Sequence, residues 1–401
     1  MAKLSKKLRL MAAVSVPIML LAASGYSQDF DGVKIGFLTD MSGGASALGG
    51  ESTAEAVRMA IEDFGGEVLG EPIELLVGDQ LNKPDVGLSI AREWFESDNV
   101  DVVVDVNSSA VALAVNDIAQ QENRIFMSGA SSPDIVGEQC ALTTTQWNAD
   151  TEMLARSIAV PLVDQGFDNW FFITADYTFG HDLEQESIEL IEEAGGNVVG
   201  SVRHPTTATD FSSFLLEAQA AGADTLALAT FGTFTVNAIK QAREFGMDLK
   251  VVPYFLTLTD IQGIGLENLE NTYSATSFYW DRTDESRAWS ERYEERWSRP
   301  PTFQNAEHYS SVLHYLKAVE AAGTDEAVAV AEAMREMPIE DETGLMAYIR
   351  EDGRVMRDMY TFQVRMPDDG ESEWAVMEIT GTLDKEEAAP PLEASACELA
   401  Q

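Results

Sequence analysis

Serine hydroxyls follow two neighbouring apolar runs of this chain, at positions where a strand would pass into a helix. Ser108 comes after Val102–Val106, and Ser131 follows Ile125–Ser128. Each serine can offer a hydroxyl and a neighbouring backbone N–H to one carboxylate, and a hydrogen bond to a charged group contributes about 1.5–3 kcal/mol. The alternative explanation is N-capping, since serine is favoured at the start of a helix whatever it binds. The pair of loops favours a site for a small anionic or polar ligand.

A glycine- and serine-rich turn after the first apolar run repeats this arrangement. Residues 33–50 read VKIGFLTDMSGGASALGG; the run Val33–Thr39 predicts a strand, and a helical pattern begins at Ser52. Such a turn leaves backbone N–H groups and small hydroxyls free at a helix N-terminus, which suits an anionic or polar ligand. Because ligands of open parallel sheets bind beyond the carboxyl ends of the strands, we expect all three loops at one site.

Aromatic side chains occupy the corresponding loops in the second half of the chain. Tyr177 and Phe179 follow the strand expected over Trp170–Thr174, and Phe231 follows the strand expected over Thr225–Thr230. These rings could cover the apolar body of a ligand whose charged end lies on the serines. Packing between helices explains them equally well, and both explanations stay open.

The sequence lacks the common signatures of catalysis and of metal binding. It contains no GxxxxGK[ST], HExxH, CxxC or GxSxG motif. Of its four histidines, His308 and His314 lie six residues apart in a helical pattern, which places them too far round the helix to share a metal ion. We therefore expect no catalytic residue, no metal site and no cofactor.

Short β-rich runs alternate with longer amphipathic runs along most of the chain. This alternation predicts βαβ units and an α/β fold with mainly parallel sheets in two doubly wound parts. The strands are expected at Val33–Thr39, Ile73–Gly78, Val102–Val106, Ile125–Ser128, Trp170–Thr174, Val198–Val202, Thr225–Thr230 and Val251–Phe255. The helices are expected at Ser52–Phe64, Val86–Phe95, Ala110–Gln120, Asp150–Val163, Asp182–Ala194, Phe211–Ala221 and Thr235–Phe245. The acidic tail Asp384–Gln401 is expected to be an extended surface segment.

The N-terminus has the three parts of a secretory signal peptide. Four basic residues precede the apolar run Leu10–Ala23, and small residues follow it up to Ser27. That run is shorter than the ~20 residues of a spanning helix, so residues 1–27 are expected to be removed on export to the periplasm. The net charge of −42, or −46 without the four basic residues, disfavours nucleic acid and anionic lipid as partners. Cys140 and Cys397 would then lie in an oxidising compartment, as one disulfide or as two free thiols.

Five segments in this order resemble the type I periplasmic binding proteins of ABC transporters, in the branched-chain amino-acid-binding (leucine/isoleucine/valine-binding-like) group. They read VKIGFLTDMSGGASALGG, VDVVVDVNSSAVALAVNDIA, FMSGASSPDI, TADYTFGHDLEQ and VNAIKQAREFGM. The resemblance runs from about Val33 to Met366. It implies two Rossmann-like lobes, joined by a hinge of three crossovers, that close on a ligand in the cleft between them. Lobe I would hold residues 32–147 and 277–357, and lobe II residues 148–276 and 358–401.

The resemblance also implies which residues contact the ligand. Its carboxylate would lie on the loops that contain Asn107–Ser108 and Ala130–Ser131, and aromatic residues would contact it from lobe II. Leu48 takes the place of an aromatic residue that family members often have in the first loop. The predicted ligand site therefore consists of Leu48, Asn107, Ser108, Ala130, Ser131, Tyr177, Phe179 and Phe231.

The segment after the last strand of lobe II bears on the kind of ligand. In the family an acid there accepts the ligand's amino group, but Tyr254–Asp260 has no acid at the expected place. An ammonium group buried without a counter-charge would cost several kcal/mol. The sequence therefore looks closer to family members that take up carboxylates such as aromatic acids, although Asp176 or Asp260 could supply the missing charge.

We therefore expect the extracytoplasmic solute-binding component of an ABC importer, which captures a small carboxylate by lobe closure. Its expected partners are the ligand and the membrane permease subunits, and its expected state is a monomer. The main alternative is a secreted α/β hydrolase or amidase acting on a small acid derivative, which would need an activated serine that no local motif shows. A sensory ectodomain of the same fold would need a transmembrane helix downstream.

Overall fold

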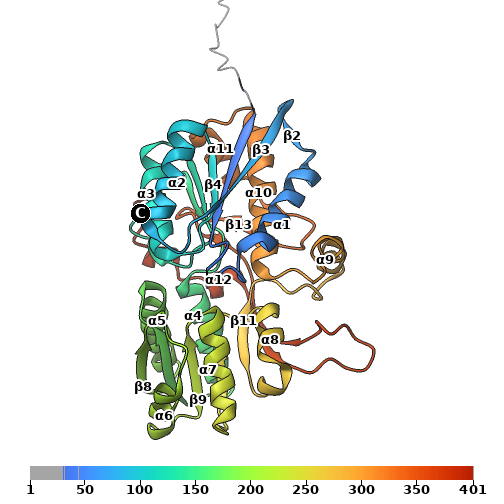
Figure 1. Ribbon diagram of the computed structural model, residues 1–401. Helices are drawn as coiled ribbons and strands as arrows, with labels where there is room; N and C mark the ends of the chain where they lie inside the picture. Colours follow the sequence, from blue (N-terminus) through green and yellow to red (C-terminus); the bar gives the residue numbers. More distant parts are fainter. Residues whose placement is uncertain (1–29, 31, 44, 401) are drawn as a thin grey trace, which may run out of the picture. The chain divides into compact units, whose positions relative to one another are not determined.

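The computed structural model describes residues 30, 32–43 and 45–400, and the chain from residue 31 onward belongs to one compact unit. Two mainly parallel sheets with helices on their faces and two small antiparallel sheets make up this unit (Figure 1). The α/β fold predicted from the alternating runs is therefore confirmed. The predicted signal peptide, residues 1–27, lies outside the described residues.

The first sheet has the strand order β2-β3-β1-β4-β5-β6, and all neighbours except β2 and β3 pair in parallel. Its strands are β1 (Val33–Thr39), β2 (Glu67–Val68), β3 (Glu71–Asp79), β4 (Val102–Asp105), β5 (Ile125–Ser128) and β6 (Thr144–Gln146). The helices of this part are α1 (Gly50–Phe64), α2 (Pro84–Glu93), α3 (Ser109–Gln121), α10 (Phe303–Ala322) and α11 (Ala327–Glu336). Because elements cover both faces, β4 and β5 are buried along their whole length, as their continuous apolar runs predict.

The second sheet has the order β10-β9-β7-β8 and is parallel throughout. Its strands are β7 (Asn169–Ala175), β8 (Asn197–His204), β9 (Thr225–Ala229) and β10 (Lys250–Pro253). Its helices are α4 (Thr151–Asp164), α5 (Thr178–Glu193), α6 (Ser212–Ala220), α7 (Gly232–Glu244) and α8 (Leu258–Ile264). Alternate residues of β7 enter two different hydrophobic clusters, Trp170 and Phe172 on one face and Phe171 and Ile173 on the other.

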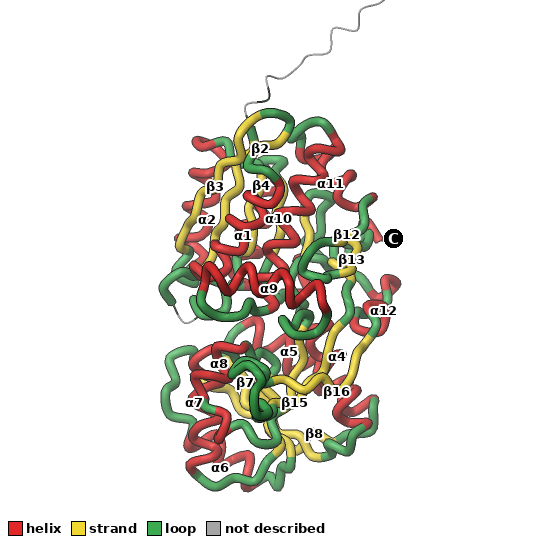
Figure 2. The backbone as a smooth tube through the Cα atoms, turned by 90° about the vertical axis from the view of Figure 1, so that its right-hand side faces the viewer, coloured by secondary structure: helices red, strands yellow, loops and turns green. Residues whose placement is uncertain are grey.

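Two small antiparallel sheets belong to different parts of the molecule. The strands β11 (Tyr273–Thr276), β15 (Met359–Val364) and β16 (Met377–Leu383) form one, and β12 (Ile339–Glu340), β13 (Met346–Ile349) and β14 (Val355–Met356) form the other. Figure 2 shows β15 near α4 and β13 below α11, in agreement with their contacts. The chain therefore passes between the two parts three times: after β6, between β11 and α9 (Asp284–Trp297), and between β14 and β15. The residue boundaries of the two lobes stay predictions.

The helix starts in the second part lie nearer the strands than predicted. Helix α5 begins at Thr178 and α7 at Gly232, three or four residues before the predicted starts. Hydrophobic periodicity missed these first turns because they contain few large apolar residues: residues 178–181 include only Phe179, and residues 232–235 include only Phe234. Tyr177 and Phe231 consequently occupy N-cap positions, and Phe179 lies in the first turn of α5.

The C-terminal tail is not the extended surface segment that its acids and prolines suggested. It contains α12 (Lys385–Ala388) and the 3-10 turns Leu392–Ala394 and Glu398–Ala400. It also buries Ala388, Ala389 and Cys397. Cys397 forms a disulfide with Cys140, 257 residues earlier in the chain. The sequence left open a disulfide or two free thiols, and the structure contains the disulfide. Because it closes a long loop, this disulfide reduces the conformational entropy of the unfolded chain.

Candidate ligand-binding site

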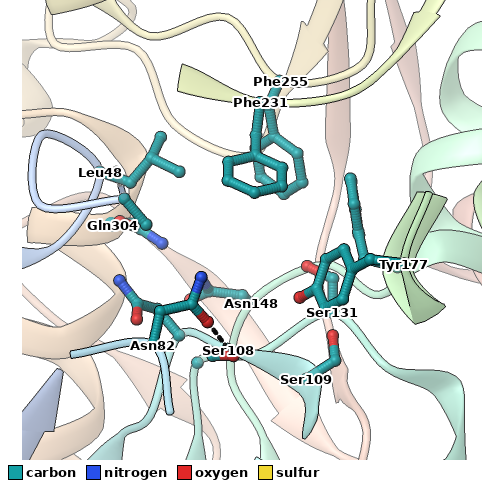
Figure 3. Close-up of a pocket in the computed structure, with 14 residues that line it drawn as sticks. Leu48, Asn82, Ser108, Ser109, Ser131, Asn148, Tyr177, Phe231, Phe255 and Gln304 are labelled. Carbon is teal, nitrogen blue, oxygen red and sulfur yellow. Dashed lines mark hydrogen bonds between the residues drawn. The ribbon is translucent and has the colours of Figure 1, made fainter. Parts of the chain in front are cut away.

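A cavity of about 480 Å³, including its opening to solvent, lies where loops of both parallel sheets meet. Figure 3 shows the rings of Phe231 and Phe255 across the open space from Asn82 and Ser108, and the ring of Tyr177 beside Ser131. The cavity is lined by Ala45, Leu48, Asn82, Asn107, Ser108, Ser109, Gly129, Ser131, Asn148, Tyr177, Phe179, Phe231, Phe255 and Gln304.

Two groups of lining residues are named here for use below. The polar rim comes from the first-sheet loops and the starts of α3 and α10: Asn82, Asn107, Ser108, Ser109, Ser131, Asn148 and Gln304. The aromatic wall comes from the second sheet and the starts of its helices: Tyr177, Phe179, Phe231 and Phe255.

The loop between β1 and α1 is shaped by a buried carboxylate. The two oxygens of Asp40 accept hydrogen bonds from the backbone N–H groups of Gly43 (2.7 Å) and Ala45 (3.0 Å). The loop then turns so that Ala45 and Leu48 line the cavity. Because the oxygens of Asp40 are bonded within the loop, this acid serves the backbone rather than the cavity.

The end of β4 carries two consecutive residues in the left-handed region of backbone space. Asp105 has φ 75° and Val106 has φ 55°, a conformation that costs energy in non-glycine residues and is concentrated at functional sites. The next residue, Asn107, accepts hydrogen bonds on its side-chain oxygen from Gln80 Nε2 (2.7 Å) and the backbone N–H of Asp40 (3.3 Å). Its Nδ2 group has no partner among the described residues, so Asn107 reaches the cavity as a hydrogen-bond donor.

Ser108 occupies the N-cap position of α3 but does not cap the helix with its side chain. Its hydroxyl donates to the side-chain oxygen of Asn82 instead, over 2.5 Å, as the dashed line in Figure 3 shows. The N-capping alternative considered for this serine is therefore not what the structure contains. The first turn of α3 is left without a serine cap at the edge of the cavity, which is the environment in which helix N-termini bind anions.

The loop after β5 approaches the end of β4 closely. The backbone N–H of Gly129 donates to the carbonyl of Asp105 over 2.5 Å. Ser131 lines the cavity, as predicted, but Ala130 is not among the lining residues. The carbonyl of Ala130 instead accepts a hydrogen bond from the side-chain amide of Gln146, so its backbone is used in joining the loop to β6.

The aromatic wall is a continuous set of ring contacts. The centroids of Phe179 and Phe255 lie 5.4 Å apart, and Phe231 lies 6.1 Å from both Tyr177 and Phe179. Several of these pairs are edge-to-face or tilted, the arrangements that aromatic rings prefer. The wall therefore offers a preformed apolar surface to a ligand held by the polar rim.

Tyr177 connects the aromatic wall to the polar rim. Its hydroxyl lies close to Ser108 and Ser109, whose polar groups influence its pKa. Figure 3 shows the Tyr177 ring beside Ser131 and Ser109, at the edge of the open space. Burial raises the pKa of Tyr177 above its ordinary value, so the hydroxyl stays neutral and can both donate and accept.

No charged side chain is among the cavity-lining residues that the structure describes. Asp176 is bonded to His181, with 2.9 Å between Oδ1 and Nε2. Asp260 accepts hydrogen bonds from the backbone N–H and the hydroxyl of Thr257 in the capping box of α8. Neither of the two acids that the sequence left open as partners for an ammonium group lines the cavity.

Two buried pairs of ionisable side chains lie behind the polar rim. Nε2 of His308 is 3.2 Å from Oδ1 of Asp105, and Nη1 of Arg357 is 2.5 Å from Oε1 of Glu307. Glu307 also accepts a hydrogen bond from the hydroxyl of Ser277, and its burial raises the pKa of its carboxyl. These pairs join strand ends to α10 without lining the cavity. In the described part of the chain no group of three His, Cys, Asp or Glu side chains is placed to hold a metal ion.

Seven of the eight predicted ligand residues line one cavity, and Ala130 is the exception. Sequence reasoning missed Asn82, Asn148, Phe255 and Gln304 among the larger side chains. Asn82 and Asn148 follow the ends of β3 and β6, so the rule that selected Ser108 and Ser131 would also have found them. This rule does not point to Gln304, because Gln304 lies at the start of α10, more than 150 residues after Asn148, and does not follow a strand of the first sheet.

Comparison with known proteins identifies the chain's relatives. The family model described as "Periplasmic binding protein" matches residues 32–371. A crystal structure of a periplasmic binding protein from Burkholderia mallei is 39% identical, with a TM-score of 0.89, and covers 92% of this chain and 100% of that one. A branched-chain amino acid ABC transporter periplasmic ligand-binding protein from Burkholderia xenovorans is 34% identical, with a TM-score of 0.84 and the same coverage.

A curated relative gives the same result from sequence alone. "Leu/Ile/Val-binding protein homolog 7" of Brucella suis is 26% identical over 360 residues, which are 84% of this chain and 88% of the relative. In the described part of the chain, none of the helices has the length and apolar character needed to cross a membrane. The family consists of solute-binding proteins rather than enzymes. The chain belongs to the periplasmic binding protein family, in the group of branched-chain amino-acid ABC transporters.

Proposed function

We propose that this protein is the periplasmic solute receptor of an ABC importer and that its ligand is a small carboxylate without an ammonium group. The observation that carries the proposal is the composition of the cavity lining. Hydrogen-bond donors face rings across the space, and no charged side chain is among the described lining residues.

The polar rim is suited to a carboxylate. Asn107 Nδ2 and the hydroxyl of Ser131 are neutral donors at the cavity, and the first turn of α3 adds the positive end of a helix dipole. Hydrogen bonds to an anion contribute about 1.5–3 kcal/mol each, so two or three of them can hold a carboxylate without an arginine or lysine.

An α-ammonium group has no comparable partner. Its burial without a counter-charge would cost several kcal/mol. The two acids that the sequence left open as its partners, Asp176 and Asp260, are hydrogen-bonded elsewhere. The aromatic wall fits a flat or apolar ligand body instead. The ligand class that best matches both sides of the cavity is therefore an aromatic acid.

Proteins of this fold differ in what they bind. A solute-binding protein from Rhodopseudomonas palustris was solved with 3,4-dihydroxybenzoic acid, and a structure from Thermotoga maritima is of a leucine-binding protein. Each is 21% identical to this chain, with TM-scores of 0.81 and 0.78. The fold thus accommodates both aromatic acids and amino acids. The uncharged lining of this cavity is our reason for choosing an aromatic acid.

Capture would work by domain closure. A ligand that contacts the polar rim and the aromatic wall at once binds the closed state better than the open one, and this difference in affinity drives closure. The permease would then recognise the closed form in the membrane. The monomeric state stays a prediction.

The proposal is tested with acids that form matched pairs. 3-Phenylpropionate and phenylalanine differ only in the α-ammonium group, and benzoate and leucine extend the comparison. A ligand that binds the folded protein raises its melting temperature. We expect benzoate or 3-phenylpropionate to raise it and the two amino acids to leave it unchanged. A larger shift with phenylalanine or leucine, or no shift with any carboxylate, would overturn the proposal.

A further inference from the structure

Two side-chain amides of the polar rim have buried polar atoms without a hydrogen-bond partner among the described residues. Asn148 is 1% exposed, and neither its Nδ2 nor its Oδ1 has a partner among the described residues. Gln304 is 3% exposed, and its Oε1 has none either. Both side chains line the cavity. Buried amide groups are nearly always hydrogen-bonded, and leaving one unbonded costs about 1–3 kcal/mol.

Backbone hydrogen bonds fix the position of Asn148. The N–H of Trp147 donates to the carbonyl of Ser128 (2.8 Å), and the N–H of Thr151 donates to the carbonyl of Ser131 (3.0 Å). The segment that contains Asn148 is therefore fastened on both sides to the loop of Ser131. These bonds fix the backbone on both sides of Asn148, whose side chain lines the cavity.

The start of α10 places Gln304 and leaves its side chain free for the cavity. The N-cap residue Thr302 is paired with Asn305, whose Oδ1 accepts from the Thr302 backbone N–H (2.8 Å) and hydroxyl (3.0 Å). The amide nitrogen of Asn305 donates to Thr53. The capping and packing at this helix end thus use Asn305 and not Gln304.

The two ends of the polar rim lie on different sides of the open space. Figure 3 shows Gln304 beside Leu48, and it shows Tyr177, Ser131 and Ser109 on the opposite side. A ligand whose carboxylate lies on the side of Ser131 would therefore present another part of its body to Gln304.

We infer that Gln304 and Asn148 select a ligand with a second, uncharged hydrogen-bonding group, such as a hydroxyl or a carboxamide, in addition to its carboxylate. This inference rests on the proposed function and narrows its ligand class. An amide offers both a donor and an acceptor, which matches a neutral group of either kind. A second charged group would find no counter-charge in the described lining.

The test uses the wild-type protein with benzoate, its three monohydroxy isomers and 4-carbamoylbenzoate, measured by calorimetric titration. At least one substituted acid should bind about tenfold or more tightly than benzoate, because the plain acid leaves the amides unbonded. Equal or weaker binding of all four substituted acids, when benzoate itself binds, would overturn the inference and leave the proposed function intact. Failure of every carboxylate to bind would overturn both.

Two variants assign the preference to its residues. Gln304→Leu and Asn148→Leu keep approximately the size of each side chain and remove its polar atoms. In at least one of them we expect the advantage of the preferred acid over benzoate to fall to about twofold or less. Gln219→Leu is the matched control, since it removes an exposed amide on α6. If the preferred acid keeps its affinity advantage over benzoate in both cavity variants, Gln304 and Asn148 are not the residues that select it. The melting temperature of each unliganded variant checks that it is folded.

Discussion

The polar rim and the aromatic wall hold their residues by different means. In the rim, side-chain amides fix the loops, as when Gln80 binds the side-chain oxygen of Asn107 and Gln146 binds the carbonyl of Ala130. The wall has ring-on-ring contacts at centroid distances of 5.4–6.4 Å. Directional hydrogen bonds fix the place of one chemical group, whereas ring contacts tolerate several shapes.

This difference separates two parts of recognition. Asn107, Ser108 and Ser131 of the rim should determine that the ligand has a carboxylate and where that group lies. The wall should determine which bodies can be attached to it. Changes at Asn107, Ser108 and Ser131 are therefore expected to weaken all ligands together. Changes in the wall, like those at Gln304 and Asn148, are expected to alter the ranking among ligands.

The largest expected effect comes from disturbing the support of the rim at Gly129. A Cβ there would lie 2.7 Å from Nε2 of His308 and closer still to the carboxylate of Asp105. Overpacking of this kind costs about 1–3 kcal/mol, so Gly129→Ala should lower the free energy of unfolding by that amount in urea titrations. Ligand binding should weaken as well because the loop of Ser131 moves.

Gly263→Ala is the control for this substitution. No atom lies within 4 Å of a Cβ at Gly263, which is in α8 and has no positive φ. Alanine is a better helix former than glycine, so this variant should be as stable as the wild type or more stable. Equal stability of the two variants would show that the rim is not tightly packed against its support.

Removal of a rim hydroxyl should have the next largest effect. Ser131→Ala takes away a donor to the carboxylate and should weaken the binding of every acid about tenfold or more. Ser108→Ala should act in the same direction, by a similar factor, because it also breaks the bond to Asn82. Titrations with benzoate and 3-phenylpropionate measure both. Unchanged affinity in both variants would remove the serines from the site.

A change in the wall should alter selectivity by a smaller factor. Phe255 lines the main cavity and also a second one of about 280 Å³ with a mostly apolar lining that includes Leu154, Phe303 and Met359. Phe255→Ala removes the ring that both share, so the ratio of 3-phenylpropionate to benzoate affinity should rise several-fold. A uniform loss for both acids would mean that the wall contributes affinity but not selectivity.

The smallest effect on ligand binding is expected from a substitution of Glu186, which lies in α5, the helix that also contains Phe179. Burial, together with the neighbouring charge of Asp150, raises the pKa of Glu186 from 4.5 to about 9. Between these values the folded protein holds a proton that the unfolded chain has lost, so the free energy of unfolding falls as the pH rises. Glu186→Gln should make this fall shallower between pH 5 and 9, with little change in ligand affinity at neutral pH. An unchanged slope would show that Glu186 titrates normally.

The sequence predicted the elements of the fold well because its strands are continuous apolar runs between loops with strong turn signals. The run Val102–Val106 became β4 with one residue fewer. The prediction of an extended surface tail was wrong because it relied on the acidic composition of the segment, whereas two of its alanines and Cys397 are buried. Such burial depends on contacts with distant parts of the chain, and composition does not report them.

Local sequence patterns were also sufficient to predict part of the ligand site. Ser108 and Ser131 follow strand ends, so local pattern was sufficient to place them together. Phe255 was assigned to the end of a strand that the structure ends at Pro253, so its ring was not considered for the cavity. Gln304 reaches the cavity only through the path of the chain between the two parts, which no local pattern reveals.

A crystal structure with benzoate, or with the acid that binds most tightly in the titrations, tests the central claim most directly. Our account places the ligand carboxylate within about 2.7–3.2 Å of the Ser131 hydroxyl and the first turn of α3, with its ring against Phe179 and Phe231. A carboxylate that points away from the polar rim, or a ligand bound outside this cavity, would contradict it.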